Sequence, residues 1–91
     1  MKIIAVCGMG IGTSIILKMN IDNALAKLDV DADVEAADIS AARGAASSAD
    51  LVFTSSELAD QLGELDTPII IIDDFTNVGE IEEKLIEELD L

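Results

Sequence analysis

The 91-residue chain contains no histidine and a single cysteine, Cys7. One cysteine cannot form an internal disulfide, and a thioredoxin-like redox motif needs a second one. We therefore expect a reducing, cytoplasmic environment, in which the thiol can stay reactive. The sequence also lacks the usual clusters of metal ligands, so neither a metal ion nor another cofactor is expected.

Basic residues are scarce: five lysines and arginines stand against 19 acidic residues, for a formal net charge of -14. Such a surface repels phosphate backbones and anionic lipid, so nucleic acid is not an expected partner. Most of the acids are expected on solvated faces, as in Glu80–Leu89, where they lie opposite an apolar stripe. Adaptation to a salty cytoplasm is an alternative origin of the acidity.

Long apolar runs are missing as well. No stretch approaches the roughly 18 consecutive apolar residues that cross a bilayer, so no direct membrane insertion is expected. The apolar N-terminus is interrupted by glycines and then by Lys18, which favours folded structure over an export signal. We expect a soluble protein.

What is present indicates one α/β domain over residues 1–91, because 51% of the residues are hydrophobic and the length allows one core. Apolar, β-branched runs predict strands, and apolar residues at helical spacing predict helices. The strands are expected at Lys2–Val6, 32–37, Leu51–Thr54 and Pro68–Ile72. A first helix is expected from Ser14 to about Leu28 and a second at 40–48; a third follows Ser55 or Ser56, and a fourth starts at Asn77. The residues expected on their apolar faces are Leu17, Ile21, Ala24, Leu25 and Leu28 in the first, Leu58, Ala59 and Leu62 in the third, and Val78, Ile81, Leu85 and Leu89 in the fourth.

Small polar residues mark three of the helix starts. Ser40 is expected to cap the second helix, although Gly44 weakens that helix. Ser55 or Ser56 is expected to cap the third. Asn77, with Glu80 three residues later, resembles a capping box at the start of the fourth.

Alternating strands and helices imply right-handed crossovers and a parallel sheet flanked by helices on both faces, as in Rossmann or flavodoxin-like folds. We expect the strand order 2-1-3-4. Ligands of such sheets bind beyond the carboxyl ends of the strands, near the point where the strand order reverses. The segment CGMGIGTS, residues 7–14, lies at that point.

Glycines in this segment predict an anion-binding loop. Gly8, Gly10 and Gly12 allow backbone N–H groups to converge, and the start of the following helix favours negative charge. The same donors stabilise a thiolate at Cys7, the candidate nucleophile. The predicted phosphate-binding residues are Gly8, Met9, Gly10, Ile11, Gly12, Thr13 and Ser14.

Some of these residues have simpler alternative roles. Thr13 and Ser14 could merely cap the helix. Met9 and Ile11 could either dock a partner protein or pack beneath the loop.

Spacing separates this loop from similar ones. A Walker loop needs a lysine before its Ser/Thr, and the dinucleotide fingerprint needs glycine at position 13, which is Thr13 here. A small tyrosine phosphatase needs an arginine at that same position. A thiol enzyme acting on phosphoesters is disfavoured, because no base or arginine accompanies Cys7.

The segment CGMGIGTS after the first strand, continued by IILKMNIDNAL along the first helix, resembles one family. This family is the IIB components of the phosphoenolpyruvate-dependent sugar phosphotransferase system (PTS), which have a lactose/cellobiose-like fold. The ascorbate type is the most similar, and the galactitol type has a less glycine-rich loop. The pattern covers nearly the whole chain, but the specific residues lie in the first 25 or so.

The resemblance implies a phosphotransferase that works through a phosphocysteine. Cys7 would accept a phosphoryl group from a phosphohistidine of the partner protein IIA. It would then pass the group to a sugar bound by the membrane transporter IIC. Ascorbate is the implied sugar, although a pentitol or hexitol would fit the same loop. The alternative is a non-catalytic module whose glycine-rich loop binds an anion or a nucleotide.

Loops after the third and fourth strands are expected to approach the loop at Cys7. They make Thr54, Ser55, Asp73 and Asp74 candidate residues of the rim. Helix capping and strand-end solvation are their alternative roles.

Overall fold

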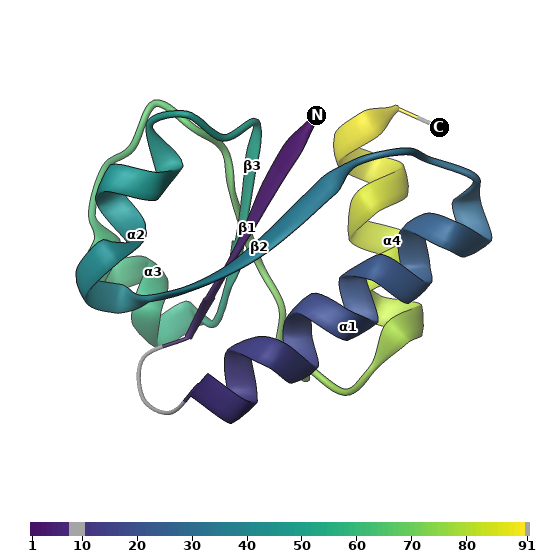
Figure 1. The fold of residues 1–91 in the computed structure, drawn as a ribbon, viewed down its shortest axis with the longest axis horizontal. Helices are drawn as coiled ribbons and strands as arrows, with labels where there is room; N and C mark the ends of the chain where they lie inside the picture. Colours follow the sequence, from purple (N-terminus) through teal and green to yellow (C-terminus); the bar gives the residue numbers. More distant parts are fainter. Residues whose placement is uncertain (8–10, 91) are drawn as a thin grey trace.

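A computed structural model describes residues 1–7 and 11–90, and for residues 11–14 it describes the backbone alone. Strands and helices alternate along the chain (Figure 1). The strands are β1 (Lys2–Cys7), β2 (Asp33–Asp38), β3 (Leu51–Thr54) and β4 (Ile69–Ile71). The helices are α1 (Ile11–Leu28), α2 (Ile39–Ala46), α3 (Ser56–Leu62) and α4 (Val78–Leu89).

The four strands form one parallel sheet in the order β2-β1-β3-β4. This confirms the predicted α/β class and the predicted strand order. β1 lies inside the sheet, with β2 on one side and β3 on the other. Because all strands run the same way, their carboxyl ends meet at one edge of the sheet.

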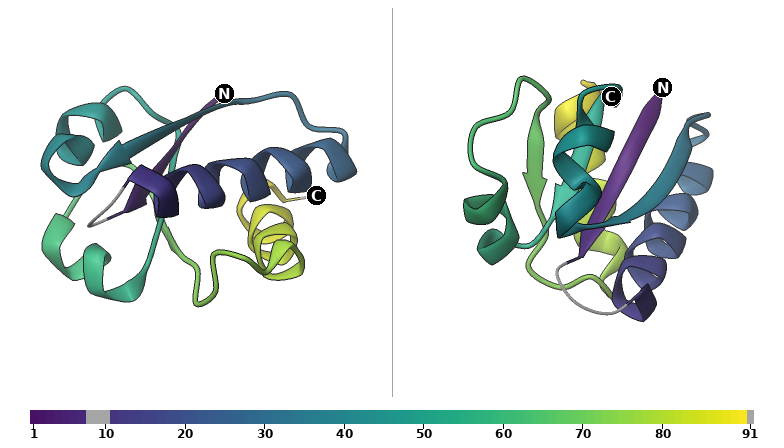
Figure 2. Two further views of the ribbon diagram at one scale, coloured as in Figure 1. Left: turned by 60° about the horizontal axis from the view of Figure 1, so that its bottom comes forward. Right: turned by 60° about the vertical axis from the view of Figure 1, so that its left-hand side comes forward.

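Helices cover both faces of the sheet. α1 and α4 lie on one face, and α2 and α3 lie on the other (Figure 2). Side chains alternate along β1, so Ile3 and Ala5 pack under α1 and α4, whereas Ile4 and Val6 pack under α2 and α3. A strand buried in this way on both faces needs a nearly continuous apolar sequence, which KIIAV provides.

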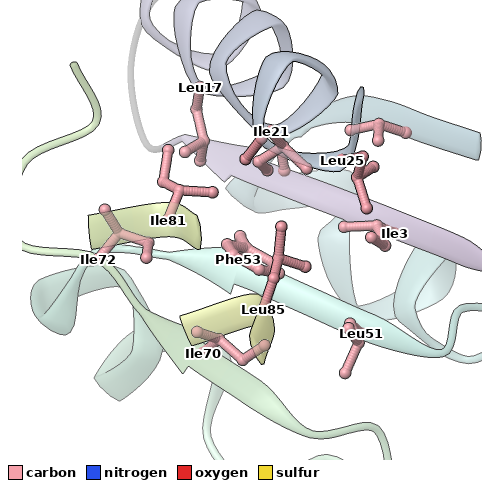
Figure 3. Packing of buried hydrophobic residues seen from close by; sticks show 13 residues of the cluster. Ile3, Leu17, Ile21, Leu25, Leu51, Phe53, Ile70, Ile72, Ile81 and Leu85 are labelled. Atoms are coloured by element: carbon pink, nitrogen blue, oxygen red, sulfur yellow. The ribbon is translucent and has the colours of Figure 1, made fainter. Parts of the chain in front are cut away.

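The larger core lies between the sheet and the pair α1 and α4. Figure 3 shows Leu17 and Ile21 of α1 pointing towards the sheet, where Phe53 of β3 fills the centre. Ile81 and Leu85 of α4 complete this core from the side of β3 and β4. The apolar faces predicted for the first and last helices are therefore confirmed.

The fourth strand differs from its prediction. The run Pro68–Ile72 was expected to be a core strand, and Ile70 and Ile72 are indeed buried. However, β4 is an edge strand of three residues, and Ile71 is 41% exposed. Because Pro68 precedes the strand, its missing N–H removes no donor from the ladder, and its carbonyl still accepts a hydrogen bond from the Val52 N–H.

Two helix starts also differ from their predictions. α1 begins at Ile11 rather than at Ser14. α2 is capped by Asp38 and not by Ser40, because the Asp38 carboxylate accepts a hydrogen bond from the Ala41 N–H at 3.0 Å. Ser55 caps α3, as expected, by accepting a hydrogen bond from the Leu58 N–H.

The helices show no membrane-spanning segment: within residues 1–7 and 11–90, none is both long and apolar enough to cross a bilayer.

Gly44 and Gly63 give a matched test of helix stability. Gly44 lies inside α2, where an added Cβ would meet no atom within 4 Å. Gly44→Ala should therefore raise the free energy of unfolding by about 0.5–1 kcal/mol, measured by urea denaturation. Gly63 ends α3 with a φ of 68°. Gly63→Ala should lower the same free energy by about 1 kcal/mol or more. An unchanged or lowered stability of Gly44→Ala would contradict this account of α2.

Candidate functional site

The carboxyl edge of the sheet brings the ends of three strands together. β1 ends at Cys7, which lies opposite Asp38, the last residue of β2, in the parallel register. β3 ends at Thr54 on the other side of β1. Cys7 thus lies between the carboxyl ends of β2 and β3.

Cys7 is almost fully buried, with 7% of its surface exposed. By the alternation along β1, it shares the face of Ile3 and Ala5, which is the face covered by α1. The start of α1 lies near the end of β1 in both Figure 1 and Figure 2. The thiol therefore belongs to the side of the sheet on which the first helix begins.

The first turn of α1 supplies backbone donors on this side. The first N–H groups of a helix have no intrahelical acceptor, and the helix dipole adds a partial positive charge. α2, α3 and α4 begin at side-chain caps, which are Asp38, Ser55 and Asn77. The residue before α1 is Gly10, which has no side chain that could cap the helix.

The predicted phosphate loop lies partly outside the described residues. Gly8, Met9 and Gly10 are outside them, and so are the side chains of Ile11, Thr13 and Ser14. The backbone places Ile11, Gly12, Thr13 and Ser14 in the first turn of α1. Thr13 and Ser14 lie after the first residue of α1, so the helix does not begin at either of them.

Asp38, the neighbour of Cys7 in the register, was not singled out in the sequence. Its carboxylate accepts hydrogen bonds from the Ser40 hydroxyl at 2.6 Å and from the Ala41 N–H. The hydrogen bond from Ser40, and then that from Ala41, lowers the pKa of Asp38 below its ordinary value. The signal for this cap was an aspartate at the end of a strand and directly before a helix.

Thr54 and Ser55 were considered as rim residues, with helix capping and strand-end solvation as alternative roles. Thr54 is fully buried, and its hydroxyl donates a hydrogen bond to the Val6 carbonyl at 3.2 Å. Ser55 caps α3. Thr54 therefore lies at the carboxyl end of β3 but is buried, and it is not part of the exposed rim.

The loop after β4 is held by hydrogen bonds with Glu80 of α4, by hydrogen bonds within the loop, and by a hydrogen bond from Asn20 of α1. The N–H groups of Asp73 and Asp74 donate to the Glu80 carboxylate at 2.8 and 3.1 Å. Asp74 accepts from the hydroxyl and the N–H of Thr76, and the hydroxyl is the main cause that lowers the pKa of Asp74. Asn20 of α1 donates to the Phe75 carbonyl at 2.7 Å and so joins the loop to the first helix.

These contacts correct the prediction for the start of α4. Asn77 caps the helix as expected, because its side chain accepts a hydrogen bond from the Glu80 N–H. The carboxylate of Glu80, however, accepts from Asp73 and Asp74 in the preceding loop. Asp73 and Asp74 are exposed at the strand end, which agrees with the simpler role considered for them.

Outside the buried face of α1, the side chains that follow its first turn include a charged pair and an apolar patch. The ammonium of Lys18 pairs with the Asp22 carboxylate at 2.9 Å, one turn further along the helix. Ile15, Ile16 and Met19 are 43%, 45% and 58% exposed, and this apolar patch was not recognised in the sequence. Exposed apolar groups of this kind are typical of protein interfaces.

A surface depression of about 590 Å³ lies elsewhere and is lined by residues 63–69. It adjoins Pro68 and Ile69, at the amino end of β4, whereas Cys7 ends β1 at the opposite edge. Across residues 1–7 and 11–90, no group of three or more histidine, cysteine, aspartate or glutamate side chains is placed to hold a metal ion.

Comparison with known families decides what kind of domain this is. The family model described as "PTS system, Lactose/Cellobiose specific IIB subunit" matches residues 2–87. The chain belongs to this family. The resemblance seen in the first strand, loop and helix is thus confirmed, and the match extends over nearly the whole chain.

Curated relatives of this IIB chain carry the name "Ascorbate-specific PTS system EIIB component". The protein from Mycoplasma pneumoniae is 34% identical over 61 residues, which are 67% of this chain and 64% of that protein. The protein from Escherichia coli O157:H7 is 33% identical over 61 residues, which are 67% of this chain and 60% of that protein. The matched part therefore spans less than two thirds of the length of these relatives.

The fold of the IIB chain is similar to that of a solved structure, the lactose-specific IIB component domain of the PTS from Streptococcus pneumoniae. The TM-score is 0.63 at 17% sequence identity, and the match covers 99% of this chain and 95% of that one. This likeness confirms the fold.

Glu80 gives a test of how the loop beside the site is held. Glu80→Ala removes the acceptor for the N–H groups of Asp73 and Asp74. It should lower the free energy of unfolding by about 1 kcal/mol in urea denaturation. Glu83→Ala, an exposed position on the same helix, is the control and should change it by less than about 0.5 kcal/mol. Equal effects of the two substitutions would contradict the role of Glu80.

Proposed function

We propose that this chain is a cytoplasmic IIB phosphocarrier, with residues 1–91 forming its phosphocarrier domain and Cys7 as the acceptor. Cys7 takes a phosphoryl group from a phosphohistidine of a IIA protein and passes it to a sugar bound by a membrane IIC transporter. The observation that carries the proposal is the place of Cys7: it ends the central buried strand of a IIB-family fold, on the face where α1 begins.

The chemistry requires two displacements at phosphorus. In the first, the Cys7 thiolate attacks in line, the S–P bond forms, and the N–P bond breaks as the donor imidazole leaves with its electron pair. In the second, a sugar hydroxyl oxygen attacks, the O–P bond forms and the S–P bond breaks, the hydroxyl proton passes to water, and Cys7 leaves as the thiolate. Phosphocysteine is the covalent intermediate that joins the two steps.

The start of α1 is suited to hold the transferred group. The N–H groups of its first turn and the positive end of its dipole favour a phosphoryl group, which adds roughly two negative charges. We assign the phosphate-binding role to Gly8, Met9, Gly10, Ile11, Gly12, Thr13 and Ser14, on the glycine pattern and on the position of 11–14 in this turn. Gly10 supports this assignment, because it cannot cap the helix itself.

Charge at the edge of the sheet is compatible with an added anion. The carboxylates of Asp38, Asp74 and Glu80 each accept hydrogen bonds from nearby donors. Their negative charge is therefore partly compensated in place.

The partners and the sugar are proposed on the names of the relatives. Ascorbate is the sugar of choice for a first test, because the curated relatives carry the name ascorbate-specific. The exposed patch of Ile15, Ile16 and Met19 lies on the helix that begins beside Cys7, where a protein donor must approach. Apolar surface at this place favours protein partners over a small-molecule donor.

The intact mass of the chain tests the proposal. The protein is incubated with phosphoenolpyruvate, enzyme I, the histidine carrier protein and an ascorbate-type IIA, with Cys7→Ser in parallel. The wild type should gain the mass of one phosphoryl group, and Cys7→Ser should gain none, because the hydroxyl of serine is a far weaker nucleophile at neutral pH.

Two outcomes would contradict the proposal. One is an unmodified wild type beside a IIA that is itself phosphorylated, which would favour the module that only binds anions. The other is equal modification of the wild type and Cys7→Ser, which would place the phosphoryl group on another residue.

A further inference from the structure

Thr54 is a polar side chain that is fully buried in the described part of the chain. A hydroxyl in an apolar interior is unfavourable unless it is hydrogen-bonded. Its partner is the carbonyl oxygen of Val6, at 3.2 Å, a residue 48 positions away in the sequence. The hydroxyl therefore makes a long-range contact with the residue directly before Cys7.

This contact lies just beyond the end of a strand pairing. The register of β1 and β3 pairs Ile3 with Leu51, Ile4 with Val52 and Ala5 with Phe53. One residue further on, the Thr54 side chain donates to Val6. A side-chain hydrogen bond thus continues the attachment of β1 to β3 up to the peptide that joins Val6 to Cys7.

Fixing the Val6 carbonyl also restrains the backbone of Cys7. The peptide group is planar, so the Val6 oxygen, the Cys7 nitrogen and the Cys7 Cα move as one unit. That plane fixes the position of the Cys7 Cα, from which the side chain starts, and the pairing of Cys7 with Asp38 in β2 restrains the rotation about the N–Cα bond that sets the Cα–Cβ direction. The hydroxyl of Thr54 is therefore linked to Cys7 through the Val6–Cys7 peptide.

Thr54 is itself held on its other side. Its carbonyl accepts a hydrogen bond from the Ile72 N–H at 2.9 Å, which joins it to the end of the β4 segment. The next residue, Ser55, caps α3 by accepting from the Leu58 N–H. The anchor for Cys7 is thus connected to both neighbouring elements and has little freedom to move.

We propose that Thr54 is a positioning residue for Cys7, whose hydroxyl holds the Val6–Cys7 peptide so that the sulfur is aligned for in-line attack on phosphorus. The inference rests on the proposed phosphocarrier function. Alignment of the reacting atoms is a large part of the rate of a group transfer, so a small rotation of this peptide should slow the transfer.

Thr54→Val and Thr54→Ser separate the hydroxyl from the shape of the side chain. Valine keeps the branched shape and loses the donor, whereas serine keeps the donor. The measurement is the single-turnover rate of phosphoryl transfer from an ascorbate-type phospho-IIA to the chain, with the folded fraction of each variant determined by urea denaturation. Thr54→Val should slow transfer about tenfold per folded molecule, and Thr54→Ser should stay within about twofold of the wild type.

The outcomes are distinct. Transfer by folded Thr54→Val at the wild-type rate overturns the inference, and so does Thr54→Ser as slow as Thr54→Val. If Thr54→Val does not fold, Thr54→Ala takes its place as the variant without a hydroxyl. A purely structural role would lower stability and leave the rate per folded molecule unchanged.

A second readout is independent of the proposed function. Alkylation of Cys7 by iodoacetamide needs a correctly presented thiol and no protein partner. Its rate should change about threefold or more in Thr54→Val and stay near the wild-type value in Thr54→Ser. If the wild type accepts no phosphoryl group, the proposed function fails, and unchanged alkylation in Thr54→Val would then overturn the positioning role separately.

Discussion

Burial of β1 on both faces is the constraint on which the arrangement of the site depends. Ile3, Ile4, Ala5 and Val6 are all 0% exposed, and the strand is paired on both sides. Such a strand cannot shift its register without exposing apolar side chains or breaking two sets of hydrogen bonds. The end of β1, and Cys7 with it, is therefore fixed by the core of the whole domain.

The parallel arrangement of the strands brings other segments of the chain to the edge at which β1 ends. Every helix that follows a strand begins at the same edge, so Cys7 lies among the starts of helices and the loop after β4. Three of these starts are capped by the side chains of Asp38, Ser55 and Asn77. The first helix instead follows Gly10, which has no side chain that could cap it, and we assign the binding of the phosphoryl group to this turn. In the proposed function, this asymmetry provides the place for a phosphoryl group in a chain with a net charge of -14.

The sequence predicted the parts of the fold that depend on local pattern. The apolar run of β1, the helical spacing of Leu17, Ile21 and Leu25, and the cap at Ser55 all follow from neighbouring residues and agree with the structure. The strand order agreed because few topologies satisfy right-handed crossovers. The place of Cys7 at a strand end could be predicted for the same reasons.

Contacts between distant segments could not be read from the sequence. Thr54 was expected at the rim, because nothing local shows that its hydroxyl meets the Val6 carbonyl 48 residues away. Glu80 was expected to complete a capping box, yet the loop after β4 brings the N–H groups of Asp73 and Asp74 to its carboxylate. The exposed Ile71 reflects its place on an edge strand, which an apolar run alone does not reveal.

The most direct test of the central claim is the ³¹P NMR spectrum of the native chain after phosphorylation by the IIA relay. The account predicts one protein-bound signal at the chemical shift of an S-phosphorylated thiol, since Cys7 is the one thiol of the chain. A signal at the shift of an ordinary phosphate ester would contradict it, because the phosphoryl group would then be carried by a hydroxyl oxygen and not by Cys7.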